Sequence, residues 1–240
     1  EDVEIGPYCI VGPEVEIGKN TVLHSHVNLV GNTKIGKNNE IFPFASIGTP
    51  PQDLKYKGEK NSLVIGDNNK FREYVNINPG TKNGGEVTKI GNNNLLMVYC
   101  HVAHDCNLSN NIVLANNVQV GGHVTIDDNA IVGGSCAIHQ FSRIGESAMI
   151  GGMTGVLSDV IPYGLSIGNR NSLIGLNLIG LRRLKISNEN IKIMQKAYDI
   201  IFSSENFRSN IANLNPDIKN NEFVIKIANF INSDKKRPIS

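Results

Sequence analysis

Aliphatic side chains recur at every sixth position along most of the chain. The frame begins at Ile5, breaks after Ile47, resumes at Ile65 and, after a second break, runs without a gap from Ile90 to Val156. A period of six fits neither the stripe of an amphipathic helix nor the alternation of a half-buried strand. It fits a parallel β-helix, in which three short strands make one coil of about 18 residues. The pattern therefore predicts an all-β prism for this part of the chain.

The fourth residue after each aliphatic is usually small or β-branched, and this is the second inward-leaning position of the hexad. In the later coils it holds Ile112, Val118, Val124, Ala130, Ser142, Ala148, Thr154 and Val160. All four cysteines share this position: Cys9, Cys100, Cys106 and Cys136. A free cysteine packs as a small hydrophobe, so we expect these thiols to line the core.

Two stretches leave the six-residue frame, residues 49–63 and residues 79–89. Loops that leave a regular solenoid commonly build its binding face. We therefore expect both stretches to contribute to a functional site.

Beyond Val160 the hydrophobic period becomes helical. One helix face carries Ile191, Met194, Tyr198 and Ile201. Ser187, just before them, is a candidate N-cap. The predicted organisation is a β-helix over residues 1–172, followed over residues 173–240 by a small α-helical domain that covers its C-terminal end.

Charge and composition exclude several functions. The chain has 23 basic and 22 acidic residues, with a formal net charge of +1, so it has no field to attract nucleic acid or a membrane surface. No apolar run approaches the roughly 18 residues that span a bilayer, so we expect no stable membrane insertion. Four cysteines in 240 residues do not indicate a disulfide scaffold, and no signal peptide is visible. A reducing cytoplasm is the expected location.

The stretch YCHVAHDC, residues 99–106, looks like a zinc site when read as a string. The hexad places both of its cysteines inward, which removes the sulfur ligands, and we expect no metal. His101, His104 and Asp105 fall at other hexad positions and face outward. His123 and His139 do the same, so the histidines cluster on the outer wall.

The repeat of about 18 residues identifies neighbours in successive coils, which lie about 4.8 Å apart. It places His104 beside Gly122 and Asp105 beside His123. A base beside an exposed backbone N–H is what acyl transfer needs, because one group removes a hydroxyl proton and the other stabilises the oxyanion. Asp105 could orient either imidazole. Gly152, in register with Gly134, would leave a bare strip for an alkyl chain.

Several motifs closely resemble the UDP-N-acetylglucosamine O-acyltransferases that start lipid A biosynthesis in Gram-negative bacteria. They are IGPYCIVGP, QDLKYKGE, HVAHDC, LANNVQVGGHVTIDD, HQF, MIGG and GLRR. The resemblance covers nearly the whole chain, and by that alignment about one N-terminal coil of the family is absent from this sequence. It implies a left-handed parallel β-helix of hexapeptide repeats that assembles as a homotrimer, with an active site at each subunit interface in the cytoplasm of a Gram-negative bacterium.

The resemblance also implies roles for individual residues. His104 would be the general base, Asp105 its partner, and the N–H of Gly122 the oxyanion donor. The substrate-binding residues would be Asp53, Lys55, His101, His123, His139, Gln140, Gly152, Asn177 and Arg183. Among these, Gly152 matches the position that sets acyl-chain depth.

The substrates implied by the resemblance are UDP-N-acetylglucosamine and a 3-hydroxyacyl-acyl carrier protein, whose thioester is a co-substrate, and no cofactor is implied. An (R)-3-hydroxyacyl group would move to the 3-hydroxyl of the sugar. Basic residues of the helical domain would steer the acidic carrier protein: Arg182, Arg183, Lys185, Lys192 and Lys196.

The chain departs from the family pattern at three places that bear on substrate binding. Asn78 and Pro79 replace a histidine and an arginine, Leu184 replaces a basic residue, and Arg170 stands where a histidine is common. Acyl-chain length and O- or N-acylation of the sugar are open at this point. Three alternatives are a sibling N-acyltransferase, which carries an extra N-terminal domain, a zinc hydratase on the same scaffold, and a passive solenoid with flat repetitive faces.

Overall fold

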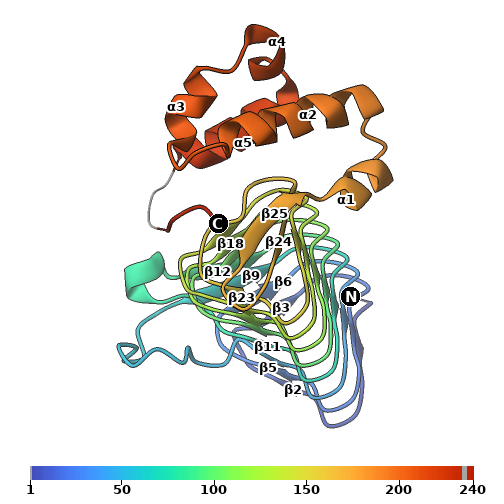
Figure 1. Cartoon of the computed structure of the whole chain (residues 1–240). Coiled ribbons are helices and arrows are strands. Elements are labelled where there is room, and N and C mark those ends of the chain that lie inside the picture. The colour runs from blue at the N-terminus through green and yellow to red at the C-terminus, as the bar shows by residue number, and fades with distance from the viewer. Residues whose placement is uncertain (1, 234–236) are drawn as a thin grey trace.

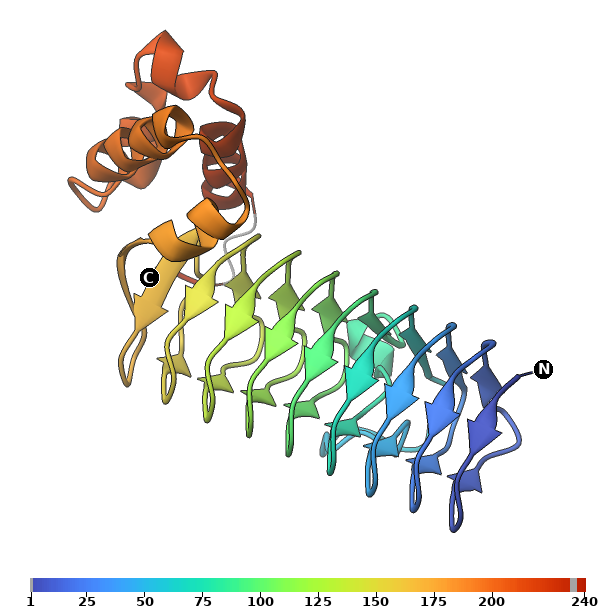
Figure 2. The ribbon, with the colours of Figure 1, turned by 90° about the vertical axis from the view of Figure 1, so that its right-hand side faces the viewer.

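The computed structural model describes residues 2–233 and 237–240, and its main body is a triangular prism. Three sheets of short parallel strands form the walls, and the chain passes from one wall to the next in a left-handed parallel β-helix (Figures 1 and 2). We call the walls sheets A, B and C in the order in which each coil visits them. The predicted fold class is confirmed.

Sheet A has ten strands in the described part of the chain. They are β1 (Glu4–Ile5), β4 (Val22–Leu23), β7 (Glu40–Ile41), β10 (Lys70–Phe71), β13 (Leu95–Leu96), β16 (Val113–Leu114), β19 (Ile131–Val132), β22 (Met149–Ile150), β24 (Gly164–Ile167) and β25 (Ser172–Leu176). The final pair, β24 and β25, is antiparallel and closes the prism.

Sheets B and C have eight and seven strands over the same described residues. Sheet B contains β2 (Ile10–Val11), β5 (Asn28–Leu29), β8 (Ser46–Ile47), β11 (Asn76–Ile77), β14 (His101–Val102), β17 (Gln119–Val120), β20 (Ala137–Ile138) and β23 (Gly155–Val156). Sheet C contains β3 (Glu16–Ile17), β6 (Thr33–Ile35), β9 (Ser62–Ile65), β12 (Val87–Ile90), β15 (Asn107–Leu108), β18 (Thr125–Ile126) and β21 (Arg143–Ile144).

The pairing register follows the predicted repeat wherever no loop intervenes. His101 pairs with Gln119, and Val102 with Val120, so each coil advances the chain by 18 residues. The hexad aliphatics fill the interior, and Leu96, Val102 and Val120 are fully buried. The fourth-position residues are also inside, including Cys100 and Cys106 at 0% and 1% exposure. Both inward positions of the hexad are therefore confirmed.

Most corners contain a residue in the left-handed conformation, which lets the chain turn sharply. Asp105 and His123 have φ values of 60° and 60°. A non-glycine residue costs roughly 1–2 kcal/mol there. This turn directs the side chains of Asp105 and His123 away from the core, at the same corner of successive coils.

Both off-frame stretches emerge at the corner between sheets B and C. The first lies between β8 and β9, and the second, which carries the 3-10 helix η1 (Lys82–Gly84), lies between β11 and β12. Figure 1 shows both projecting from one side of the prism. The Asn78 side chain joins them, because its Nδ2 donates to the carbonyl oxygens of Thr49 at 3.1 Å and Pro50 at 3.4 Å.

A helical domain covers the C-terminal end of the prism (Figure 2). Its helices are α1 (Leu178–Arg183), α2 (Asn188–Ile201), α3 (Phe207–Ala212), α4 (Pro216–Lys219) and α5 (Glu222–Asn232). Ser187 caps α2 as predicted, accepting the N–H of Asn190. The last strand extends to Leu176, so the change from strand to helix follows the predicted start of this domain by a few residues.

The two parts are joined by buried contacts. The Arg143 guanidinium bonds Asp159, which is 1% exposed, at 2.7 Å, and it stacks on the Phe230 ring of α5.

Among the described residues, the helices are all too short or too polar to cross a bilayer.

Candidate active site

The corner between sheets B and C collects most of the predicted site residues. The turn after β14 carries His104 and Asp105, the turn after β17 carries Gly122 and His123, and the turn after β20 carries Gln140. The two off-frame stretches emerge from the same corner in the preceding coils. We call residues 49–63 the first excursion and residues 79–89 the second excursion. Residues at equivalent positions of the repeat thus form a row of polar groups along one corner of the prism.

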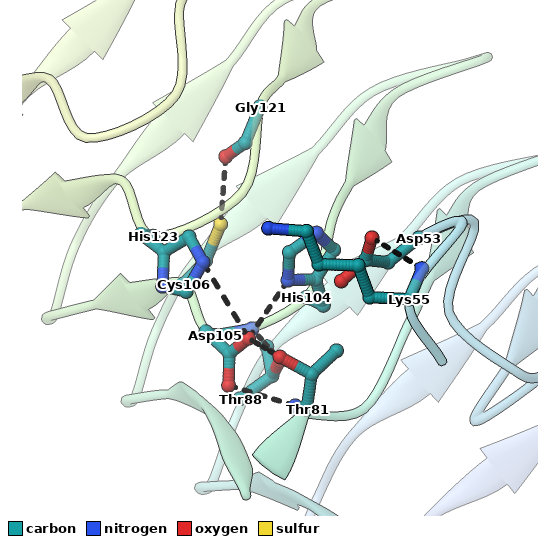
Figure 3. Close-up of polar contacts among 9 residues, drawn as sticks. All are labelled: Asp53, Lys55, Thr81, Thr88, His104, Asp105, Cys106, Gly121 and His123. Carbon is teal, nitrogen blue, oxygen red and sulfur yellow. Dashed lines mark hydrogen bonds and ion pairs between the residues drawn. The ribbon is translucent and has the colours of Figure 1, made fainter. Parts of the chain in front are cut away.

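Asp105 is the most constrained side chain in this row (Figure 3). Its side chain is fully buried, and Oδ2 accepts from Nδ1 of His104 at 2.7 Å. The backbone N–H of Thr81 donates to Oδ1 at 2.8 Å, and the Thr81 hydroxyl donates to Oδ2 at 2.6 Å. Nε2 of His123 lies 3.9 Å from the same Oδ2. Asp105 therefore bonds His104 directly and has His123 at ion-pair distance.

The pKa of the Asp105 carboxyl lies below its usual range. Burial acts to raise this pKa, but the hydrogen bonds from His104 and Thr81 favour the charged form and outweigh it. Asp105 is thus an anion at neutral pH. An anionic acceptor at Nδ1 holds the proton of neutral His104 on that nitrogen and leaves the Nε2 lone pair free.

The His104 ring lies over the α-carbon of Gly122. A Cβ added to Gly122 would stand 2.7 Å from Cε1 and 2.8 Å from Nε2 of His104, closer than any real Cβ contact. Only glycine therefore lets the imidazole take this position. Among the described residues, no backbone acceptor is bonded to the Gly122 N–H, so a base and an available donor lie side by side.

Two other histidines near His104 are held in different ways. His101 is half-buried in β14, its Nδ1 lies 2.7 Å from Oδ1 of Asn76, and burial lowers its pKa. His123 stacks on the Phe141 ring at 4.4 Å between centroids and meets His104 edge-on at 5.1 Å. These contacts orient both rings at the wall of the site.

The first excursion brings Asp53 and Lys55 to the side on which His104 lies (Figure 3). Asp53 shapes the turn, since its Oδ1 accepts the N–H of Lys55 at 3.0 Å. The Lys55 side chain is exposed. Asn78, one of the departures from the family pattern, is 1% exposed and anchors this excursion rather than facing the corner.

His139 and Gln140 stand one coil further along the same corner, and both are exposed. Gly152 lies at a different corner, between sheets A and B, where an added Cβ would be 3.4 Å from the Gly134 oxygen. The two glycines are therefore in register, as the repeat predicted. Ala137 and Gly155 pair on sheet B between these corners, so the wall there carries small side chains.

Asn177 and Arg183 do not lie at the His104 corner of the same chain. They line a groove of about 700 Å³ between helix α1 and the outer side of sheet A, with Leu184 beside them. The Asn177 side chain caps α1 by accepting the Gly180 N–H at 3.0 Å and donates to the Ser147 carbonyl at 3.1 Å. One chain alone does not bring these residues together with His104.

The cysteines of the HVAHDC region are excluded as metal ligands by their direction. Burial raises the pKa of Cys100 to about 11 and of Cys106 to about 12, and the Cys106 thiol donates inward to the Gly121 carbonyl. His104, Asp105 and His123 do have ligand atoms within 4.8 Å of one another. Both oxygens of Asp105 are already engaged by His104 and Thr81.

Sequence reasoning missed three supports of Asp105. Thr81 binds the carboxylate, the Thr88 hydroxyl accepts the Asp105 N–H at 2.8 Å, and a Cβ on Gly84 would overlap the carboxylate. Thr88 was within reach of the repeat, because it precedes Cys106 by one coil. Thr81 and Gly84 sit in the second excursion, where the repeat does not apply.

Comparison with known proteins identifies related UDP-N-acetylglucosamine O-acyltransferases. Residues 159–240 match the second domain of the UDP-N-acetylglucosamine O-acyltransferase family. The acyl-[acyl-carrier-protein]–UDP-N-acetylglucosamine O-acyltransferase of Aliarcobacter butzleri is 49% identical over 202 residues, which are 84% of this chain and 78% of that protein.

Solved structures of related enzymes are similar to this one over the full length of the chain. LpxA from Acinetobacter baumannii is 44% identical with a TM-score of 0.94, over 100% of this chain and 94% of that one. The UDP-N-acetylglucosamine O-acyltransferase (LpxA) from Moraxella catarrhalis is 42% identical with a TM-score of 0.90, over 100% and 93%.

We call the corner between sheets B and C, which carries His104 and His123, the histidine corner. The β-helix and this corner define an acyltransferase of the hexapeptide-repeat class. The chain belongs to the family of acyl-[acyl-carrier-protein]–UDP-N-acetylglucosamine O-acyltransferases.

Proposed function

We propose that the protein transfers an (R)-3-hydroxyacyl group from acyl carrier protein to the 3-hydroxyl of UDP-N-acetylglucosamine, the first step of lipid A biosynthesis. Its substrates follow from the relatives it matches. The observation that carries the chemistry is the position of His104, whose Nδ1 is bound by Asp105 and whose Nε2 edge lies over Gly122.

In this mechanism His104 is the general base. Its Nε2 accepts the proton of the sugar hydroxyl as that oxygen attacks the thioester carbonyl carbon. Asp105 keeps the other ring proton on Nδ1 and stabilises the imidazolium that forms. When the tetrahedral intermediate collapses, the carbon–sulfur bond breaks and the proton on Nε2 passes to the departing thiolate.

The Gly122 N–H stabilises the oxyanion of that intermediate. A backbone donor aimed at the developing charge is usually among the larger contributions to catalysis, worth about 3–4 kcal/mol where a single donor has been removed. No metal or organic cofactor takes part in this scheme. Asp53, Lys55, His101, His123, His139 and Gln140 would line the pocket around the reacting atoms.

A homotrimer would complete the site. Asn177 and Arg183 border the groove beside sheet A, whereas His104 stands at the opposite corner, between sheets B and C. A second copy that presents its sheet A and α1 to sheet B of the first would bring the two sets together. The exposed Arg182, Arg183, Lys185, Lys192 and Lys196 would then steer the acidic carrier protein.

The reaction is tested by mass spectrometry of the products formed from UDP-N-acetylglucosamine and a panel of 3-hydroxyacyl carrier proteins. We expect an O-acylated sugar nucleotide and a preferred chain length. Gly152→Met should shift that preference to shorter chains. No acylated product with any carrier thioester would refute the proposal.

The shared site is tested by subunit mixing. We expect His104→Ala and Arg183→Ala to be inactive or nearly so alone, and unfolding and refolding the two together should restore activity. In a mixed trimer some interfaces combine an intact His104 with an intact Arg183. A mixture no more active than its components would contradict a site built from two subunits.

A further inference from the structure

The C-terminal segment returns to the β-helix and reaches the histidine corner. The Asp159 N–H donates to the Pro238 carbonyl at 2.8 Å, and the Ser240 N–H donates to the Asp159 carbonyl at 2.9 Å. Asp159 and Ile239 form a parallel bridge, and Ile239 packs against the core of the helical domain. Residues 238–240 thus add one more short parallel segment beyond sheet C.

This anchoring places Arg237 over the turn that follows β20. Its Nε donates to the Gln140 carbonyl at 3.2 Å, and its terminal NH2 group lies within hydrogen-bonding distance of Nδ1 of His139. Nearly a hundred residues separate the partners, so the contact depends on the folded C-terminal segment. The Arg237 side chain is half-buried.

Nδ1 of His139 lies near two groups, the Arg237 guanidinium and the Gln140 carbonyl oxygen at 3.2 Å. A guanidinium has five N–H donors, no acceptor, and does not lose its charge in proteins. The Gln140 oxygen already accepts from Nε of Arg237, so the contact with the guanidinium favours Nδ1 of His139 as an acceptor, with the proton on Nε2. The hydrogen bond made by one ring nitrogen sets the state of the other.

His139 stands one coil beyond the turn that carries Gly122. A Cβ on Gly121 would lie 2.8 Å from the Gln140 N and 2.8 Å from the Ile138 oxygen, so Gly121 is in direct register with residues 138–140. Gly122, which follows, carries the free N–H beside His104. The backbone register therefore places His139 at this corner, one coil from the Gly122 turn.

We propose that Arg237 is a positioning residue that holds His139 in the neutral Nε2–H tautomer, so that His139 donates a hydrogen bond to an oxygen of the bound substrate. The substrate half of this inference rests on the proposed acyl transfer. The tautomer half does not, because it depends only on the contact between Arg237 and His139.

Long-range 15N–1H NMR of the histidine-labelled full-length protein tests the tautomer directly. His139→Gln assigns the signal. We expect Nε2–H with bare Nδ1 in the wild type, a mixture of both tautomers in Arg237→Met, and retention of Nε2–H in Arg237→Lys, which still donates. Arg208→Met is the matched control, since Arg208 lies in the same C-terminal region but donates to the Ile231 carbonyl.

Steady-state kinetics tests the consequence. Arg237→Met should raise KM by up to about tenfold, the scale of one lost hydrogen bond, with little change in kcat. In the His139→Gln background the same substitution should have no further effect, because the two residues act as one unit. Arg208→Met should match the wild type.

Two results would overturn the inference: an Nδ1–H tautomer in the wild type, or additive effects of Arg237→Met and His139→Gln. A failure of the proposed function is distinguishable, since the wild type itself would then show no acyl transfer.

Discussion

The imidazole of His104 occupies the space that a side chain on Gly122 would fill. Cε1 and Nε2 of His104 lie 2.7 and 2.8 Å from the position of a Cβ on Gly122. This contact joins two consecutive coils and brings the proposed base to the proposed oxyanion donor. It also fixes the residue type at position 122.

Gly122→Ala should therefore displace His104 and lower kcat by roughly 100-fold or more, the scale for losing an oxyanion contact, while the protein stays folded. The measurement is kcat with circular dichroism as a folding check. Gly12→Ala is a matched control in the first coil, where the added methyl would meet the Val30 α-carbon at 3.3 Å. Equal activity of the two variants would contradict the geometry.

Asp105→Asn should lower kcat by about 100-fold or more, because an amide no longer stabilises the imidazolium and can favour the wrong His104 tautomer. His123→Gln should have a smaller effect on kcat, since His123 lies 3.9 Å from Asp105 whereas His104 is bonded at 2.7 Å. Single-turnover rates at saturating substrate measure both. The reverse order would assign Asp105 to His123.

The ionised form of Asp105 should also stabilise the fold in a pH-dependent way. Its folded pKa lies below the usual value, whereas the unfolded carboxyl takes up a proton at about pH 3.9, the ordinary pKa of aspartate. The stabilisation is fully present above that pH and is lost as the pH falls through the folded pKa. Denaturant unfolding should show Asp105→Asn furthest below the wild type at neutral pH. A gap that stays constant toward pH 3 would contradict this.

Asp159→Ala should loosen the helical domain, because it leaves the Arg143 guanidinium without its buried partner. Breaking such a pair costs about 3–5 kcal/mol. Thermal unfolding and hydrogen exchange in α5 report the loss. Lys226→Met is the control, since the Lys226–Glu146 pair is half-exposed and should contribute less than about 1 kcal/mol. Equal losses from both variants would show that Asp159 does not anchor the domain.

The thiols inside the prism should be unreactive in the native protein. The pKa of Cys106 is raised by burial to about 12, so almost no thiolate forms at pH 8. Iodoacetamide labelling with peptide mapping should modify half-buried Cys9 first, and Cys100 and Cys106 only after unfolding. Rapid native labelling of Cys106 would contradict its inward direction.

The repeat alone was enough to predict much of this corner. It placed Asp105 beside His123 and His104 beside Gly122, and it placed the cysteines inside, because each depends only on counting hexads. It left the partner of Asp105 open, since a one-dimensional register does not say which imidazole turns toward the carboxylate. The structure shows that His104 does, through Nδ1.

The remaining contacts depend on chain segments that the repeat does not describe. Thr81 reaches Asp105 from an excursion whose path is set by tertiary packing. Arg237 reaches His139 from the far end of the chain. Asn177 and Arg183 were assigned by resemblance, and the single chain holds them beside sheet A, away from His104, at positions that the repeat does not describe.

The most direct test of the account is the activity of His104→Ala and His104→Gln with UDP-N-acetylglucosamine and a 3-hydroxyacyl carrier protein, alongside size-exclusion chromatography. We predict that both variants keep the wild-type assembly and melting temperature and lose acyl transfer by at least about 100-fold, the lower bound for removing a general base. Full turnover by either folded variant would contradict the assignment of His104 as the base.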